Sequence, residues 1–282
     1  MDGESRSWRL ARESWLLPRS GAVMGILNVT PDSFSDGGRY NGVHSAVAHA
    51  RKMLAEGADI IDIGGESTRP GSDELPVEVE LSRVLPVVEA LRGEFPAARL
   101  SIDTRHAEVA HAALRAGADI VNDITGLADA AMRRVCCDFS CGIVLMHMQG
   151  NPATMQQNPT YDDVVGEVRA FFEERVSLAL ADGIAAEHIC LDPGIGFGKT
   201  VEHNLALIRN LESLRVRNLP LMMALSRKRF LGELVGNPQE AKSQAWPTVV
   251  MSLMAADKGA DVHRVHDVAE LRRALALRAA IL

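Results

Sequence analysis

Eight short apolar runs, each followed by a longer amphipathic stretch, are the feature that most constrains the fold of this 282-residue chain. The runs have the length and the nearly continuous apolar character of strands that are buried on both faces. In chain order they are VMGILNV (23–29), DIIDIGG (59–65), RLSIDT (99–104), DIVNDI (119–124), GIVLMHM (142–148), HICLDPG (188–194), LMMALSR (221–227) and DVHRVHDV (261–268). Between them, apolar residues recur every three or four positions, which predicts helices at 45–58, 77–95, 107–118, 162–183 and 201–214.

This eight-fold alternation predicts an α/β fold, a parallel (β/α)₈ TIM barrel. The phrases EGAD, AGAD and KGAD, at 56–59, 116–119 and 258–261, each indicate a helix that ends at glycine before a strand begins. No low-complexity segment or linker divides the chain. We therefore expect a single domain over 1–282, with the barrel proper from about residue 22 and residues 1–21 as an N-terminal extension.

Composition restricts the class of protein. A net charge of −7 argues against general nucleic-acid binding. No apolar run reaches the roughly 18 residues of a membrane-spanning helix, and the N-terminus is too charged for a signal peptide, so a cytoplasmic location is expected. The four cysteines lack the spacing of a zinc site or a disulfide framework. A local basic pocket could still hold an anionic small molecule.

Polar residues follow the predicted strands at the end where TIM barrels place their active sites. Any one of them could cap the helix that follows. Together they would leave many polar groups buried around one rim, which is costly unless a ligand uses them. They include Asn28, Asp103, Asn122, His147, Asp192, Lys228, Arg264 and His266. A nucleotide-binding loop is excluded, because Pro193 stands where the first glycine of a P-loop would have to be.

Eight motifs in this order give the chain a specific resemblance. They are MGILNVTPDSFSDGG, DIGGESTRPG, SIDT, NDI, LMHMQGNPATMQ, LDPGIGFGKT, SRK and RVHDV, spread from Val23 to Val268. With these motifs the chain resembles the dihydropteroate synthase family of folate biosynthesis. The resemblance implies a TIM-barrel transferase that joins p-aminobenzoate to 6-hydroxymethyl-7,8-dihydropterin diphosphate and releases diphosphate, with Mg²⁺ as cofactor. It also implies a homodimer and a target of sulfonamides.

The resemblance also implies roles for most of these rim residues. Asp192 accepts the amino group and ring N–H of the pterin, and Asn122 meets the neighbouring ring edge. Asp103 faces the side of the ring where positive charge develops, and Lys228 addresses the ring carbonyl and nitrogen opposite. The pterin-binding set is Asp103, Asn122, Met146, Asp192, Phe197 and Lys228, and the catalytic set is Asp103, Lys228, Arg264 and His266. For Met146 and Phe197 a place in the hydrophobic core is the alternative.

Two loops and the diphosphate complete this expectation. Arg264 and His266 project from one side of a strand toward the phosphates, and the amide oxygen of Asn28 helps to hold Mg²⁺. Residues 30–38 form a lid that keeps water from a cationic pterin intermediate, and the segment from Ser67 to Gly71 closes against it. The residues expected around diphosphate and p-aminobenzoate are Asn28, Thr30, Phe34, Thr68, Arg69, Pro70, Arg229, Arg264 and His266.

Two departures and two alternatives accompany the resemblance. Arg229 stands where members of the family often have serine, at a helix start expected to receive the p-aminobenzoate carboxylate, and 242–252 lacks an expected Gly-Ser pair. A methyltransferase domain that serves methyltetrahydrofolate and a corrinoid would share the fold and the pterin-facing residues. It has no need for the anion-binding set. A non-catalytic pterin-binding paralogue should have lost part of that set, so a stepwise, SN1-like transferase is favoured.

Overall fold

The computed structural model describes residues 6–29, 38–66 and 75–281. Eight parallel strands form one sheet in the order β8-β7-β6-β5-β4-β3-β10-β9. Their bounds are β3 (Ala22–Asn28), β4 (Ile60–Gly64), β5 (Arg99–Asp103), β6 (Ile120–Asp123), β7 (Gly142–Met146), β8 (Ile189–Asp192), β9 (Met222–Met223) and β10 (Val262–Val265). A parallel bridge from Leu191 to Leu221 joins the two outer strands. The predicted TIM barrel is confirmed.

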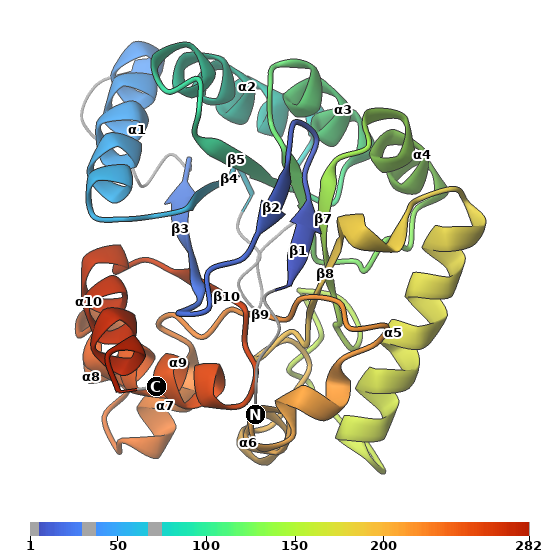
Figure 1. Ribbon diagram of the computed structural model, residues 1–282, viewed down its shortest axis with the longest axis vertical. Coiled ribbons are helices and arrows are strands. Elements are labelled where there is room, and N and C mark those ends of the chain that lie inside the picture. Colours follow the sequence, from blue (N-terminus) through green and yellow to red (C-terminus); the bar gives the residue numbers. More distant parts are fainter. Residues whose placement is uncertain (1–5, 30–37, 67–74, 282) are drawn as a thin grey trace.

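Helices surround the strands as an outer ring (Figure 1). They are α1 (Gly38–Ala55), α2 (Val77–Glu94), α3 (Ala107–Arg115), α4 (Ala130–Phe139), α5 (Val164–Ala181), α6 (Val201–Arg209), α7 (Arg229–Leu234), α8 (Pro238–Ser243), α9 (Trp246–Asp257) and α10 (Val268–Ala279). Local sequence explains several helix starts, because the side chains of Asp129, Asp163 and Thr200 accept backbone N–H groups of the first turn. Within the described residues no helix has the length and apolarity needed to cross a membrane.

Several predicted elements are shorter than the sequence pattern indicated, among them the strand expected over 261–268, which ends at Val265 and so leaves His266 just beyond it. The helix expected over 201–214 ends at Arg209 and continues as a separate 3₁₀ turn, Leu211–Leu214. The strand expected over 221–227 keeps only Met222 and Met223 in the ladder. Its last residue, Arg227, has a left-handed φ of 58°, and its N–H is bonded to Thr248 Oγ1 rather than to a strand. Turn formation therefore ends this strand early.

The N-terminal segment closes the amino end of the barrel. Within residues 1–21, expected only to be an N-terminal extension, the chain forms an antiparallel hairpin of β1 (Ser7–Arg9) and β2 (Ser14–Leu16). The hairpin lies across the middle of the ring in Figure 1. Its apolar side chains pack on residues near the starts of the barrel strands, in a cluster of Trp8, Leu10, Trp15, Leu17, Ala22, Met24, Ile60, Ile120, Val144, Cys190, Met222 and Val262. Trp8 also donates its indole N–H to the His188 carbonyl at 2.8 Å. The hairpin thus plugs the end opposite the predicted site.

Candidate active site

Strand register places three of the rim residues in one layer. Asn28 is the register partner of Gly64, Gly64 of Asp103, and Asp103 of Asn122. Register partners on parallel strands project to the same side of a sheet, so these residues share the carboxyl end of the barrel. Gly64 carries no side chain between Asn28 and Asp103, which leaves space over the Asp103 carboxylate. Asn28 itself is exposed.

A carboxylate that the sequence reading did not single out lies below this layer. Asp62 on β4 is fully buried, and its Oδ2 accepts Arg264 Nε at 2.6 Å and Asn122 Nδ2 at 3.2 Å. Arg264 also donates Nη2 to Asp103 Oδ2 at 2.6 Å. The predicted phosphate ligand Arg264 is therefore held between two carboxylates, with Nη1 left without a partner among the described residues.

Burial and charge shift the titration of this group. Burial raises the pKa of Asp103 to about 7, although the adjacent Arg264 acts to lower it. Burial also acts to lower the pKa of Arg264, but the carboxylates of Asp62 and Asp103 outweigh it and raise that pKa above its ordinary value. Arg264 is a permanent cation, whereas Asp103 exchanges its proton near neutral pH.

Asp192 and Lys228 form the second charged part of the site. Asp192 is 1% exposed, and its Oδ1 accepts the Gly194 N–H at 2.8 Å. Burial raises the pKa of Asp192, and it lowers the pKa of Lys228 to about 8 while the charge of Asp192 acts to raise it. Lys228 Nζ lies 4.1 Å from the centre of the Phe197 ring, a cation–π distance. The turn contact of Asp192 leaves further lone pairs for a ligand, because each carboxylate oxygen accepts two hydrogen bonds.

The two apolar candidates occupy a small cluster of their own. Met146 and Phe197 are buried together with Ile124 and Met155, and this cluster is separate from the main core between strands and helices. Its members come from segments at the carboxyl ends of β6, β7 and β8. Because Phe197 also lies under Lys228, the cluster forms an apolar wall beside the charged groups.

Lys199 and His147 form a buried pair that sequence reasoning did not assign. Lys199 Nζ lies 2.9 Å from His147 Nδ1 and donates to the Phe197 carbonyl at 2.9 Å. Burial lowers the pKa of Lys199 to about 7 and that of His147 to about 3, with Lys199 adding to the second shift. Gly194 lets its backbone pass close to the His147 carbonyl, since a Cβ at position 194 would lie 1.9 Å from that backbone oxygen. The pair holds the turn that carries Phe197.

The remaining candidates are placed less centrally. His266 Nδ1 lies 2.9 Å from Ser226 Oγ, which also accepts the His266 N–H. Arg229 begins α7 and pairs with Glu233 at 2.8 Å, with 88% of its side chain exposed. The lid segment 30–37 and the residues of the second loop lie outside the described residues, so the predictions for Thr30, Phe34, Thr68, Arg69 and Pro70 are not placed.

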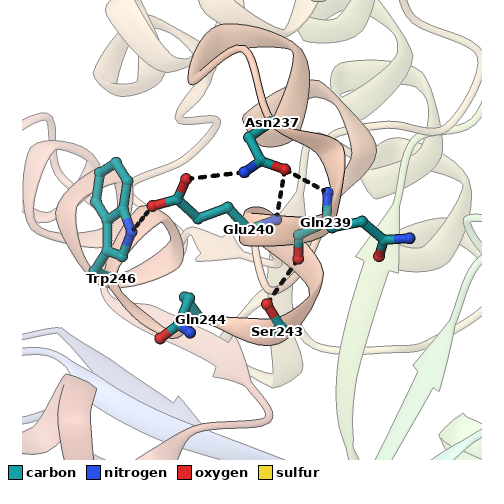
Figure 2. A pocket seen from close by; sticks show the side chains of 6 residues that line it. All are labelled: Asn237, Gln239, Glu240, Ser243, Gln244 and Trp246. Atoms are coloured by element: carbon teal, nitrogen blue, oxygen red, sulfur yellow. Dashed lines mark hydrogen bonds between the residues drawn. The ribbon is translucent and has the colours of Figure 1, made fainter.

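Two other features do not join this site. Glu66, Glu80 and His106 have ligand atoms within 4.8 Å of one another, the spacing of a metal cluster. Glu66 accepts Arg105, and Glu80 Oε2 lies 2.7 Å from His106 Nδ1, so these atoms already have partners within the protein. A pocket at α8 is lined by Asn237, Gln239, Glu240, Ser243, Gln244 and Trp246 (Figure 2). None of these lining residues is a predicted site residue.

Comparison with known proteins identifies the class of protein that this fold and site define. Residues 24–266 match the family model described as "Pterin binding enzyme". The chain is thus a pterin-binding TIM-barrel enzyme. It is 48% identical over 247 residues to dihydropteroate synthase from Synechocystis sp., covering 87% of this chain and 85% of the relative. The Escherichia coli (strain K12) dihydropteroate synthase is 47% identical over 254 residues, with 90% and 89% covered.

Solved structures agree with the sequence relatives. Xanthomonas albilineans dihydropteroate synthase with 4-aminobenzoic acid superposes with a TM-score of 0.90 at 44% identity, covering 99% of this chain and 98% of the other. The Burkholderia cenocepacia enzyme complexed with 7,8-dihydropteroate gives a TM-score of 0.87 at 40% identity, with 98% and 96% covered. The chain belongs to the dihydropteroate synthase family and is a transferase.

Proposed function

We propose that the chain joins p-aminobenzoate to 6-hydroxymethyl-7,8-dihydropterin diphosphate, and that the carbon–oxygen bond to diphosphate breaks before the amine attacks. The observation that carries this proposal is the buried Asp192 together with the half-buried Lys228 beside Phe197, within a barrel end that also holds Asp103 and Arg264. Relatives of the chain support the substrates, because their solved structures include complexes with 4-aminobenzoic acid and 7,8-dihydropteroate.

The charged groups fit recognition of a pterin. A buried carboxylate such as Asp192 is stabilised by an amino group and a ring N–H that donate to its two oxygens. Lys228 donates to the carbonyl and ring nitrogen opposite, while its stem and Phe197 exclude water from the ring. Asn122 meets the neighbouring edge. These contacts fix the pterin so that its reactive methylene faces Asp103.

Bond cleavage needs stabilisation of opposite charges on the two fragments. The electron pair of the carbon–oxygen bond leaves with diphosphate, and a positive charge remains on the pterinylmethyl group. The ionised Asp103 carboxylate stabilises that charge, while Arg264 Nη1 and His266 donate hydrogen bonds to the departing diphosphate. The amine of p-aminobenzoate then forms the carbon–nitrogen bond and releases a proton to solvent.

The residues present fit a magnesium ion at the leaving group. Mg²⁺ prefers oxygen ligands and keeps several waters, and the amide oxygen of the exposed Asn28 is such a ligand. Gly64 keeps the space between Asn28 and the unpaired Asp103 Oδ1 clear of side chains. We propose that Asn28 holds Mg²⁺, which would neutralise charge on diphosphate.

Arg229 and α7 are proposed to receive the carboxylate of p-aminobenzoate. An exposed guanidinium at this helix start pairs readily with a mobile anion, because its partner Glu233 is also solvent-accessible. Sulfonamides then compete for the same place. One structural neighbour, the Yersinia pestis enzyme, is a sulfonamide drug complex with a TM-score of 0.89 at 42% identity, covering 98% of each chain.

A homodimer is part of the proposal, and exposed apolar side chains support it. Trp246, Val250 and Met254 are 45%, 42% and 54% exposed and lie four residues apart on α9. That spacing puts them on one helix face, and Leu234 is a further exposed apolar side chain at 45%. Figure 2 shows Trp246 with its indole N–H bonded to Glu240. We assign this face to a second copy. A cytoplasmic location stays a prediction.

An assay of diphosphate release and dihydropteroate formation tests the function. With Mg²⁺, 7,8-dihydropteroate should form only when both the pterin diphosphate and p-aminobenzoate are present. A chain that binds the pterin and forms no product is a non-catalytic paralogue. Methyl transfer from methyltetrahydrofolate to a corrinoid, without dihydropteroate formation, would establish the methyltransferase alternative instead.

A further inference from the structure

Asp62 is a buried carboxylate at the floor of this site that the proposed mechanism does not use. It is fully buried on β4, two residues before Gly64, the register partner of Asp103. Its Oδ2 accepts from both Arg264 and Asn122, and its Oδ1 is buried without a hydrogen-bond partner among the described residues. A carboxylate with one unsatisfied oxygen inside a barrel costs stability, so packing does not explain it.

The contact with Asn122 fixes the orientation of that amide. A carboxylate oxygen only accepts hydrogen bonds, so the NH₂ group of Asn122 has to face Asp62. The 3.2 Å distance between Nδ2 and Oδ2 is that of a hydrogen bond. Across the planar amide, Oδ1 of Asn122 then points away from Asp62, and no residue in the described ranges bonds to it.

The charge of Asp62 is needed for a second reason. Arg264 lies between Asp62 and Asp103, 2.6 Å from an oxygen of each. Without Asp62, the guanidinium has Asp103 as its single close carboxylate among the residues described and is free to turn toward it. Asp62 therefore anchors Nε, and this leaves the other two nitrogens to face Asp103 and the ligand side.

We propose that Asp62 is a specificity-determining positioning residue, which holds Asn122 with its carbonyl oxygen toward the ligand and so selects a ring edge that presents an N–H donor. This inference rests on the proposed function, because it assumes that the ligand beside Asn122 is the pterin. A ring nitrogen without hydrogen at that edge would face an acceptor oxygen and be rejected.

A pair of variants tests the orientation directly. Asp62→Asn keeps the shape and lets the Asn122 amide turn over, so the affinity for 6-hydroxymethyl-7,8-dihydropterin, which keeps the ring N–H of the substrate and has no leaving group, should fall about 10- to 100-fold in titration calorimetry. Asn122→Asp alone should also weaken binding, since two carboxylates then lie side by side. The double variant Asp62→Asn with Asn122→Asp exchanges donor and acceptor between the two positions.

The double variant should recover affinity to within about 10-fold of the unaltered chain. In it, the new amide at position 62 can donate to the new carboxylate at position 122, and an acceptor oxygen again faces the ligand. Undiminished pterin binding by Asp62→Asn would overturn the inference, as would a double variant that binds no better than either single one. A loss of thermal stability with unchanged affinity would show a purely structural role. If the unaltered chain itself does not bind 6-hydroxymethyl-7,8-dihydropterin, the proposed function fails.

Discussion

The two ends of this barrel bury very different residues. At the amino end the hairpin side chains Trp8 and Trp15 pack on Met24, Ile60 and other apolar residues of the barrel interior. Trp8 is fully buried, and its one polar side-chain atom is bonded to a backbone carbonyl. The indole that fills this end therefore has the partner that its chemistry requires.

At the carboxyl end the interior is charged and incompletely paired. Asp62, Asp103 and Asp192 are all buried, and Asp62 Oδ1 and Asp103 Oδ1 have no hydrogen-bond partner among the described residues. Burial raises the pKa of Asp103 to about 7 and lowers that of Lys228 to about 8. Such an arrangement is unfavourable for the empty protein, and a polar ligand relieves it.

The difference separates stability from function along the barrel axis. Residues at the plugged end should mainly determine the free energy of unfolding. Residues at the charged end should mainly determine ligand affinity, as in other TIM barrels. A substitution at one end should therefore change one measured property and leave the other nearly unchanged.

Removing the plug should have the largest effect. Trp8→Ala deletes a fully buried indole and leaves the His188 carbonyl without its donor, so the free energy of unfolding should fall by about 3–5 kcal/mol. Pterin affinity of the folded fraction should stay the same. Trp8→Phe, which keeps most of the volume, serves as the matched control in denaturant titrations and should cost less. A Trp8→Ala chain of unaltered stability would contradict the plug.

Asp192→Asn should have the next largest effect, on affinity. The amide presents a donor to a ligand donor, which costs about 2–4 kcal/mol, or roughly 30- to 1000-fold in pterin affinity. Unfolding free energy should not fall, since burial already raises the pKa of this carboxyl. Titration calorimetry with 6-hydroxymethylpterin measures the first quantity, and diphosphate alone should bind as before. Normal pterin affinity of Asp192→Asn would mean that Asp192 serves only to accept the Gly194 N–H in the turn.

A buried histidine outside both ends should make stability fall in acid. His263 is fully buried and has no partner for either ring nitrogen among the described residues. Burial, with Arg278 and Arg272 of α10 in addition, lowers its pKa from 6.5 to about 4. The unfolded chain therefore binds the proton first, and about 3 kcal/mol of stability present above pH 6.5 is lost as the pH falls to about 4.

His263→Leu should remove this part of the pH dependence in denaturant titrations between about pH 7 and pH 4. Pterin affinity at neutral pH should not change, because the residue lies on the outer face of the barrel wall. An equal slope of stability with pH in both chains would mean that His263 is not the titrating group.

Arg229→Ala should have the smallest effect. An exposed ion-pairing group contributes at most about 1 kcal/mol, so KM for p-aminobenzoate should rise about 3- to 5-fold with little change in kcat. Arg273→Ala is the matched control, because Arg273 is also exposed and pairs within its own helix. Equal KM values in the two variants would remove Arg229 from the p-aminobenzoate site.

The barrel could be predicted from the sequence because the spacing of apolar residues reflects which side chains are buried. Most of the rim could also be predicted, because polar residues that directly follow an apolar run can be recognised in the sequence. The sequence reading missed the hairpin plug, since three-residue strands carry no periodic signal. It overextended the strand after 221, because turn formation at Arg227 depends on Thr248 from a distant helix. Tertiary contacts decided these elements.

Residues expected to contact a ligand could be predicted from the sequence. Residues that position another side chain of the site could not. Asp62 lies inside the run DIIDIGG, where a single acidic residue reads as part of a strand. Its role depends on Arg264, which lies 202 positions away. Lys199 stands in the glycine-rich motif LDPGIGFGKT, and its contact with His147 comes from the packing of two loops, which the motif does not reveal.

Release of diphosphate in the absence of p-aminobenzoate tests the stepwise account most directly. With Mg²⁺ and the pterin diphosphate alone, the chain should release diphosphate slowly, because Asp103, Arg264 and His266 already stabilise the separated charges. His266→Ala should depress that release together with turnover, whereas Arg229→Ala should leave it unchanged. No diphosphate release until p-aminobenzoate is added, under conditions where the complete substrates react, would contradict the account and establish direct displacement.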